Sequence, residues 1–403
     1  MNLMRRSLLG LGLAAAAPCL LLGLVNCSSD ATNTNGNTGQ PTSGGASTIG
    51  GSDSGGSGTS GAPGTAGMSG SAGAPGGAMS VGGTGGGTSS SASGLPTPTG
   101  AADKPKPSGT PMGVRVLDWA GFKGALSFTF DDTNQSQIDY FDDMNAIGLK
   151  YTYYLISGKT TQLDSPVWPK AIQAGHELGN HTRSHQQTDT GTDTDAGQQD
   201  LESKFKLKIY TMAAPMGDLS YKDVATTRYL INRGVSGATI KPNDASDPFN
   251  LPCYVPPAGT DQDYASYLAH AQAGGWDVVL IHGFTKKPDG FDEDDGAYLA
   301  VDYPKFKTEA LLPAKAASDV WTGTVLQIGA YWRAQKMFSG LTPTTSGDSK
   351  TWTWTLPDHF PPNQYLRIEV DGGTLEQNGA ALSWDGHGYY EVALDAKSLT
   401  LGP

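Results

Sequence analysis

Cysteine and basic residues are scarce in this chain of 403 residues. The three cysteines are Cys19, Cys27 and Cys253, and only Cys253 lies in a region with the composition of a folded domain. The folded part therefore has no pair of cysteines for a disulfide bond, and we expect Cys253 to be a small buried side chain. Lysine and arginine number 27 against 39 aspartate and glutamate residues, a formal charge of −12. Such a chain lacks the basic face that a nucleic-acid partner requires.

Large side chains are almost absent from residues 28–112, which consist mostly of Gly, Ser, Thr, Ala and Pro. A segment that buries so little apolar surface does not offset the entropy of ordering, so we expect a disordered tether. Before it, residues 1–27 combine Arg5-Arg6 with an apolar stretch at 8–25, the pattern of an export signal. This stretch is also just long enough to span a membrane, so an uncleaved anchor is the alternative.

The end of that segment, Leu24-Val25-Asn26-Cys27-Ser28-Ser29, resembles the processing site of bacterial lipoproteins. Asn26 departs from the small residue that usually precedes the cysteine. The resemblance implies that Cys27 is lipidated and attaches the exported protein to a membrane. Arg5-Arg6-Ser7 also loosely resembles a twin-arginine signal. Either route predicts a location in the cell envelope, outside the cytoplasm.

From residue 113 to residue 340, segments typical of strands and helices alternate. Strands are expected at residues 125–130, 150–156, 176–180, 209–213, 235–240, 277–281 and 320–326. Helices are expected at residues 136–147, 167–174, 201–208, 221–232, 263–273 and 304–318. Regular alternation of this kind predicts an α/β domain with a mostly parallel sheet, either open or closed into a barrel.

After residue 340 the pattern changes to short stretches in which apolar and polar residues alternate. Strands are expected at 351–356, 365–370, 382–384 and 389–394, separated by Asp-Gly, Asn-Gly and other glycine-rich turns. Residues 341–403 therefore predict a small all-β, sandwich-like module. Its aromatic residues either fill the module's core, which is the favoured interpretation, or bind sugar rings. These residues are Trp352, Trp354, Trp384, Tyr389 and Tyr390.

Side chains that bind metals or transfer protons follow three of the expected strands. They are Asp131 and Asp132, then His181 and His185, then His282. Taken alone, two aspartates after a strand are ordinary turn chemistry. Two histidines four residues apart and one carboxylate, however, form a common zinc set that leaves a position open for water. A second carboxylate and a third histidine can serve as general base and general acid, so the pattern predicts a metal-assisted hydrolase of amides or esters.

Residues 126–337 resemble the polysaccharide deacetylases of carbohydrate esterase family four, with the motifs in the family's order. Thr129-Phe130-Asp131-Asp132 looks like the first motif, which implies Asp131 as general base and Asp132 as metal ligand. His181-Thr182-Arg183-Ser184-His185 is similar to the second and implies two metal-binding imidazoles. Leu280-Ile281-His282 is similar to the last and implies His282 as general acid. The resemblance also implies a divalent metal, with Zn²⁺ favoured, and an incomplete (β/α) barrel of about seven strands.

Two motifs of the family are altered in this chain. Met212-Ala213-Ala214-Pro215-Met216-Gly217 aligns with the third motif, but Ala213 stands where the family has an arginine that orients the base. The backbone N–H of Met216 is then the candidate oxyanion donor. The family's fourth motif contains an Asp-Trp pair, and no such pair occurs between residues 235 and 254. Asp244 and Asp247 are the candidates for the aspartate of this motif. These departures predict a rearranged site with an altered or narrowed substrate range.

The resemblance implies an exported, monomeric enzyme that removes acetyl groups from a cell-wall or extracellular polysaccharide, with N-acetyl favoured over O-acetyl. The alternative is a surface-tethered carbohydrate-binding protein that has lost catalysis, as the absence of the motif arginine at Ala213 suggests. The presence of all five acidic and imidazole residues favours catalysis. A separate acidic run at 289–295 lacks the ligand spacing of a calcium loop, so we expect a solvated loop there.

Overall fold

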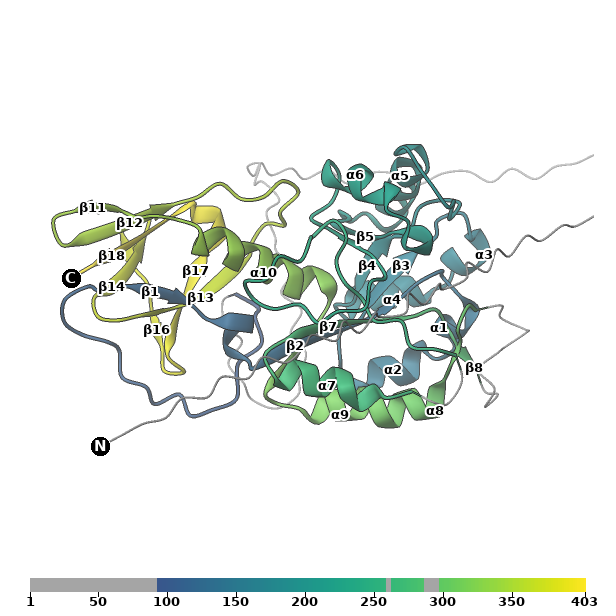
Figure 1. Cartoon of the computed structure of the whole chain (residues 1–403), viewed down its shortest axis with the longest axis horizontal. Coiled ribbons are helices and arrows are strands. Elements are labelled where there is room, and N and C mark those ends of the chain that lie inside the picture. Colours follow the sequence, from purple (N-terminus) through teal and green to yellow (C-terminus); the bar gives the residue numbers. More distant parts are fainter. Residues whose placement is uncertain (1–92, 259–261, 286–296) are drawn as a thin grey trace, which may run out of the picture. The chain divides into compact units, whose positions relative to one another are not determined.

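The computed structural model describes residues 93–258, 262–285 and 297–403, which form a barrel followed by an all-β module (Figure 1). The predicted signal segment with Cys27, the tether as far as residue 92 and the acidic run at 289–295 lie outside these residues. Within the described ranges, no helix combines the length and the apolar character needed to cross a membrane.

The barrel sheet contains seven strands, all parallel. They are β2 (Gly124–Phe130), β3 (Thr152–Leu155), β4 (Glu177–Asn180), β5 (Thr211–Ala213), β6 (Ile231–Arg233), β7 (Trp276–Ile281) and β10 (Val320–Thr322). Strand β2 pairs with β7 along one edge. Along its other edge it pairs first with β10 and, nearer its carboxyl end, with β3. From β3 the sheet continues through β4 and β5 to β6. The gap between β6 and β7 is crossed by single bridges, from Leu251 to Arg233 and from Tyr254 to Val279. The predicted incomplete (β/α) barrel is confirmed.

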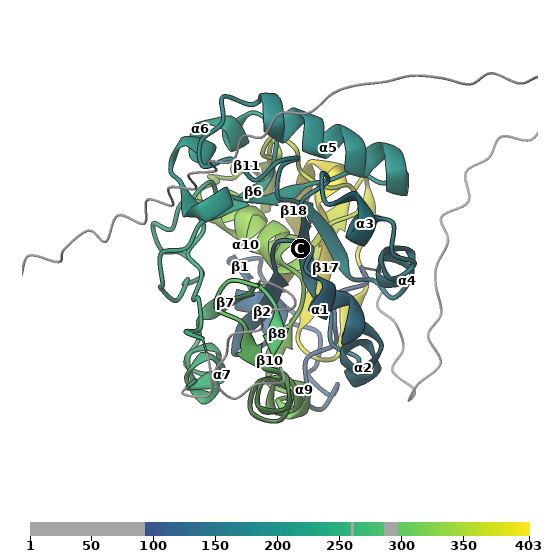
Figure 2. The same cartoon turned by 90° about the vertical axis from the view of Figure 1, so that its right-hand side faces the viewer.

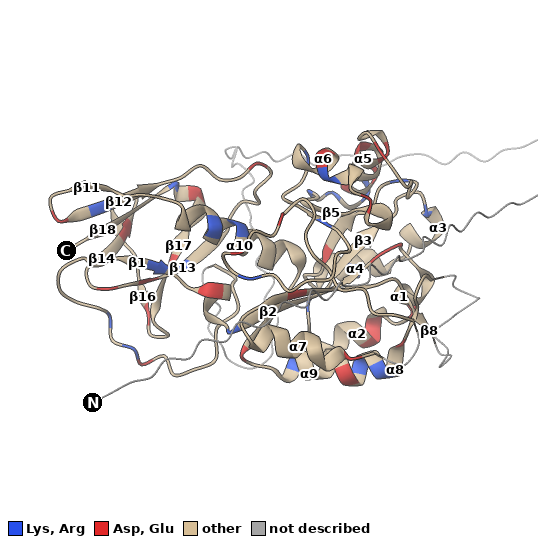
Figure 3. Ribbon diagram, in the orientation of Figure 1, with Lys and Arg blue, Asp and Glu red and all other residues tan. Residues whose placement is uncertain are grey.

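Helices surround this sheet, as Figures 1 and 2 show. They are α1 (Gln135–Asp139), α2 (Phe141–Ile147), α3 (Thr160–Leu163), α4 (Val167–Gln173), α5 (Thr192–Phe205), α6 (Ser220–Thr226), α7 (Tyr264–Gln272), α8 (Tyr303–Phe306), α9 (Leu312–Ala316) and α10 (Val325–Ser339). A π-helical turn, Lys307–Leu311, joins α8 to α9, and acidic and basic residues lie side by side along this helical stretch (Figure 3). A short parallel pair, β8 (Phe284–Thr285) and β9 (Val301–Asp302), lies beside α1 and α8.

Several predicted elements differ from the observed ones. Residues 235–240 do not form the predicted strand, and β6 instead occupies Ile231–Arg233, within the helix predicted at 221–232. A short apolar run does not distinguish a strand from a helix, and all three residues of β6 are buried. The strand predicted at 320–326 ends at Thr322, because the Thr324 side chain accepts the N–H of Gln327 and caps α10. Helix α10 itself and the first half of α5 were not predicted.

Helix α10 joins the barrel to the module through one continuous apolar cluster. That cluster includes Trp276 of β7 and Trp332 of α10, whose ring centroids lie 6.2 Å apart, and it extends to the inward residues of the module. A Cβ atom on Gly329 would lie 2.0 Å from Cδ1 of Ile231. Glycine at this position therefore allows α10 to approach β6 closely.

The module consists of two antiparallel sheets. One contains β1 (Val114–Val116), β13 (Tyr365–Val370), β17 (Tyr389–Ala393) and β16 (Trp384–Asp385). The other contains β11 (Thr344–Ser346), β12 (Ser349–Thr353), β18 (Ser398–Gly402), β14 (Thr374–Gln377) and β15 (Ala380–Ala381). Trp352, Trp354, Tyr389 and Tyr390 are at most 6% exposed, which confirms the core interpretation for these four aromatics, whereas Trp384 is half-buried.

The segment that precedes β1 is held against the module. The fully buried guanidinium of Arg367 donates to the backbone oxygens of Leu95 and Pro96, and Lys104 N–H donates to the carbonyl of Gly386 at 2.9 Å. These contacts correct the predicted domain boundaries. Residues 93–112 pack on the module instead of continuing the tether, and β1 belongs to the module's sheet because it pairs with β13.

Candidate metal centre and catalytic pocket

A pocket of about 660 Å³ lies where the loops after β2, β4, β5 and β7 converge. These loops follow the carboxyl ends of parallel strands, the end of the barrel from which α1 and β8 continue (Figure 2). The predicted general base, general acid, metal ligands and oxyanion donor all line this pocket, namely Asp131, His282, Asp132, His181, His185 and Met216. The structure thus brings residues from distant parts of the sequence together.

Asp132, His181 and His185 form a compact set of potential ligands. Their ligand atoms lie within 4.8 Å of one another, and Oδ1 of Asp132 is 3.4 Å from Nε2 of His181 and 3.5 Å from Nε2 of His185. That oxygen is buried and has no hydrogen-bond donor among the described residues. Two imidazoles and a carboxylate that converge in this way fit a divalent cation such as Zn²⁺, with further positions open toward the pocket.

The orientation of His181 is fixed by the backbone of the altered third motif. Its Nδ1 is 2.9 Å from the carbonyl oxygen of Ala213. Since a carbonyl only accepts, Nδ1 carries a proton, and Nε2 is the nitrogen that faces Asp132 and that would bind a cation after losing its own proton. Ala213 therefore contributes to the site through its main chain, although its side chain has no polar group.

The turns that carry the ligands have unusual backbone conformations. Asp132, Thr182 and His185 have φ values of 76°, 63° and 53°, in the left-handed region that costs a non-glycine residue about 1–3 kcal/mol. Hydrogen bonds hold these turns, since Thr182 N–H donates to Asn180 Oδ1 at 2.9 Å and His185 N–H donates to Thr182 Oγ1 at 3.0 Å. The fold therefore positions the ligands before any cation binds.

The pKa shifts match this arrangement of charges. Burial raises the pKa of Asp132, but the neighbouring imidazoles of His181, His282 and His185 outweigh it and leave that pKa well below its usual value. Burial lowers the pKa of His181, but the carboxylates of Asp131 and Asp132 have the larger effect, so this pKa is raised overall. Burial and the neighbouring His181 lower the pKa of His185. Asp132 is thus ionised and His185 neutral at neutral pH, the forms in which both bind cations.

Arg233 is the residue that sequence reasoning missed. Its side chain is fully buried, and one guanidinium nitrogen, Nη2, contacts Oδ2 of Asp131. The other carboxylate oxygen, Oδ1, is buried without a hydrogen-bond partner in the described part of the chain. Arg233 lies directly beside Ala213 in the β5–β6 pairing, so an arginine that orients Asp131 comes from the next strand. The alteration at Ala213 does not leave Asp131 without a cationic partner.

The position of His282 is set by two amides of the β2–α1 region. Asn134 Nδ2 donates to the His282 carbonyl at 2.8 Å and Gln137 Nε2 at 2.7 Å, while Gln137 also donates to the carbonyl of Asp131. The two catalytic candidates are therefore tied together through their backbones. The ring of Tyr298 lies edge-on to the His282 ring with centroids 5.2 Å apart. Burial is the largest of the effects that lower the pKa of His282.

The fourth-motif candidates are not part of this site. Asp244 accepts the N–H groups of Lys241 and Ser246, and Asp247 pairs with Lys222 at 2.6 Å, so each stabilises a loop. Neither residue lines the pocket. Cys253 is fully buried as expected, and burial raises the pKa of its thiol to about 12.

Comparison with known proteins gives one family match. Residues 121–228 match the sequence model of the polysaccharide deacetylase family, a segment that contains Asp131, Asp132, His181 and His185. A gellan lyase from a Bacillus species is 30% identical over 130 residues, which cover 30% of this chain and 5% of that much longer protein.

Several solved structures are also similar. One is a Mycobacterium smegmatis protein assigned to the polysaccharide deacetylases, with 21% identity, a TM-score of 0.39 and coverage of 60% of this chain and 98% of the other. Another is a family 4 acetyl xylan esterase from Clostridium thermocellum in complex with cobalt, with 14% identity, a TM-score of 0.36 and coverage of 51% and 89%. Because these TM-scores are below 0.5, the fold assignment rests on the sheet topology described above.

Proposed function

Because residues 121–228 belong to the polysaccharide deacetylase family, we propose that this protein is a metal-dependent hydrolase that removes acetyl groups from a polysaccharide. The observation that carries the proposal is the grouping in one pocket of a cation-binding set with Asp131, whose Oδ1 is free to accept a proton. Asp132, His181 and His185 would hold the ion. When bound, a divalent ion polarises an acetyl carbonyl and makes a water molecule more acidic.

The remaining steps belong to the side chains of the chain itself. Asp131 Oδ1 takes the proton of the attacking water, while Arg233 holds the other carboxylate oxygen in place. The backbone N–H of Met216, whose φ is 55°, is the proposed donor to the oxyanion. His282, which lines the same pocket, donates a proton to the leaving nitrogen or oxygen. We favour N-acetyl groups, because an amide nitrogen leaves only when it is protonated.

The rim of the pocket favours an uncharged sugar chain. Met216, Val235 and Tyr298 line it and are 63%, 40% and 65% exposed, although large apolar side chains are usually buried. Such surfaces suit the apolar faces of sugar rings. Among the described residues, the charged and titratable side chains that line the pocket are the metal-site residues, Asp131, its partner Arg233 and His282, so this part of the chain places no lysine and no second arginine there for an acidic polymer.

We extend the proposal to the location of the protein on the basis of its sequence. The export signal and the lipoprotein-type site support attachment to a membrane through a lipidated Cys27, with the body acting as a monomer in the cell envelope. Lipid labelling of the wild type and of Cys27→Ser tests this part. Labelling of both proteins would remove Cys27 as the anchor.

The test of the activity is acetate release by the purified full chain from acetylated chitin oligomers, xylan and peptidoglycan. We expect release from at least one substrate, loss of release with a chelator and recovery when Zn²⁺ or Co²⁺ is added back. Release that is unaffected by complete metal removal would refute metal dependence. Binding to these glycans with no acetate release from any of them would favour the alternative of a carbohydrate-binding protein.

A further inference from the structure

Gln137 of α1 is a fully buried polar residue that contacts the backbones of both catalytic candidates. Its Nε2 donates to the carbonyl oxygens of Asp131 and His282, the second at 2.7 Å. Because a reversed amide would set its oxygen against two carbonyl oxygens, the nitrogen must face them. We propose that Gln137 is a positioning residue that holds the general acid His282 where it can protonate the leaving group. This inference rests on the proposed function.

The two catalytic candidates depend on Gln137 to different degrees. Asp131 is also fixed by the sheet, because its N–H donates to the carbonyl of Ile281 at 3.1 Å, and Arg233 contacts its carboxylate. His282 follows the last paired residue of β7. Within the described residues, the hydrogen bonds to His282 come from Gln137 and Asn134 alone. Loss of Gln137 should therefore displace the acid more than the base.

The segment that follows β7 is held by side chains from the turn before α1 and from its first residues. Asn134 Nδ2 donates to the His282 carbonyl at 2.8 Å, and its Oδ1 accepts from Lys159 Nζ at 2.8 Å, which defines the orientation of this amide. The N–H of Phe284 donates to Ser136 Oγ at 3.0 Å. These side chains replace the strand pairing, which ends one residue before His282. The geometry of the acid is thus set by side chains that substitution can remove.

The leaving group determines how strongly the reaction depends on the acid. When the C–N bond of an N-acetyl group breaks, the sugar nitrogen takes the proton of His282 and leaves as an amine. When the C–O bond of an aryl acetate breaks, the phenolate leaves with the electron pair and needs no proton. A catalytic group displaced by about 1 Å loses roughly 10² in rate. A displaced His282 should slow only the first reaction, whereas a displaced base or a lost metal should slow both.

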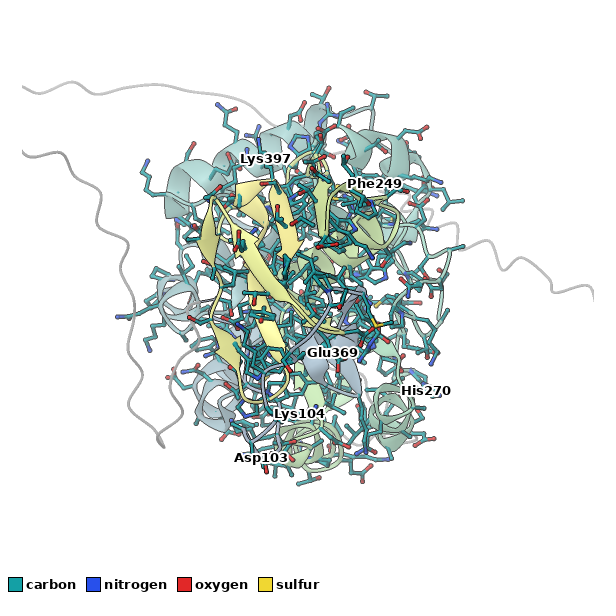
Figure 4. The ribbon with its side chains drawn as sticks, turned by 90° about the vertical axis from the view of Figure 1, so that its left-hand side faces the viewer. Asp103, Lys104, Phe249, His270, Glu369 and Lys397 are labelled. Atoms are coloured by element: carbon teal, nitrogen blue, oxygen red, sulfur yellow. The ribbon has the colours of Figure 1, made fainter. Side chains whose placement is uncertain are left out.

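Gln377 provides a matched control for the loss of a buried amide. It is 8% exposed, and its Nε2 donates to the carbonyls of Ala393 at 2.9 Å and Ser398 at 3.0 Å. Gln377 belongs to β14 of the module, whose strands face the viewer in Figure 4, where Lys397 beside Ser398 is labelled. Gln377→Leu therefore removes the same kind of hydrogen bonds from a part of the protein that holds no catalytic candidate.

The test compares full-length wild type, Gln137→Leu and Gln377→Leu, all loaded with Zn²⁺. We measure kcat and KM for an acetylated glycan that the wild type deacetylates and for para-nitrophenyl acetate, and metal per chain by elemental analysis. Gln137→Leu should lose about tenfold or more in kcat on the glycan, with unchanged KM and metal content. Its kcat on para-nitrophenyl acetate should stay within about twofold of the wild type, because that leaving group needs no acid. Gln377→Leu should match the wild type on both substrates.

Two results would overturn the proposal: an unchanged kcat of Gln137→Leu on the glycan, or an equal loss on both substrates. If Gln137→Leu does not fold, Asn134→Leu is measured in its place, because it removes a donor to His282 and none to Asp131. A loss confined to the glycan then supports the proposal, and any other pattern overturns it. Absence of acetate release by the wild type from every substrate would instead refute the proposed function, and this inference with it.

Discussion

Replacement of Arg233 by methionine tests how the base is positioned. The substitution keeps an unbranched side chain but removes a fully buried guanidinium that contacts Asp131 and lies 5.4 Å from the ring centroid of Tyr154. Removing one partner of a buried ion pair costs about 3–5 kcal/mol, because the other charge stays buried without compensation. A base displaced by about 1 Å loses roughly 10² in rate. We therefore expect lower stability together with a kcat reduced about a hundredfold.

The control is a second arginine with nearly the same environment. Arg367 is also fully buried, pairs with Glu391 at 3.1 Å and lies 4.4 Å from the ring centroid of Tyr389, but it belongs to the module. Urea unfolding should show a comparable loss of stability for Arg233→Met and Arg367→Met. At a temperature where both variants are folded, only Arg233→Met should have a reduced kcat for acetate release.

A rescue variant separates orientation of the base from general damage. Ala213 pairs directly with Arg233, so Ala213→Arg in the Arg233→Met background returns a guanidinium to the neighbouring strand at the same level. We expect the double variant to recover at least tenfold in kcat. A kcat for Arg233→Met equal to that of Arg367→Met would refute the role assigned to Arg233.

Three further predictions concern the metal, the base and the response to acid. His185→Ala should lower the divalent metal bound per chain, measured by elemental analysis after dialysis, and stoichiometric metal in the variant would exclude His185 as a ligand. Asp131→Asn should keep its metal and lose about 10²–10⁴ in kcat, and unchanged acetate release would exclude Asp131 as the base. His176 is 6% exposed and accepts the N–H of Tyr151, and burial lowers its pKa to about 4, whereas the unfolded value is near 6.5. The contribution of the buried neutral imidazole to the free energy of unfolding should therefore be complete above pH 6.5 and disappear as the pH falls to 4. Urea unfolding of the wild type should show this as a loss of about 3 kcal/mol, and the loss should be absent in His176→Gln.

The parts of the site that could be predicted from sequence depend on local pattern. Alternating apolar residues end at Phe130, and the aspartates that follow must lie at the carboxyl end of a strand. The same reasoning holds for His181 after β4 and His282 after β7. Parallel strands bring these ends to one side of a barrel, whatever their separation in sequence. Strand ends and sheet direction were sufficient to place these groups together.

The boundary between tether and module could not be predicted in the same way. Residues 93–112 have the composition of a linker, and they are ordered by groups far along the chain. Arg367 is 271 residues from Pro96, to whose carbonyl it donates at 2.7 Å. The composition of a segment indicates whether the segment can bury its own side chains. It does not indicate whether a distant strand donates hydrogen bonds to the backbone of that segment.

The substitution at Ala213 shows why a missing motif residue is weak evidence for lost catalysis. The general base Asp131 requires one guanidinium beside it. Ala213 and Arg233 are paired in register on adjacent parallel strands, so either position can provide that guanidinium. Sequence pattern did contain a signal, because Leu230-Ile231-Asn232-Arg233-Gly234 places a charged residue at the end of an apolar run, as Phe130-Asp131 does. Residues 221–232 have a pattern typical of a helix, and a helical interpretation of this run implies no register against β5. Arg233 contacts Asp131 from β6 and supplies the cationic partner whose absence at Ala213 favoured a carbohydrate-binding protein without catalysis.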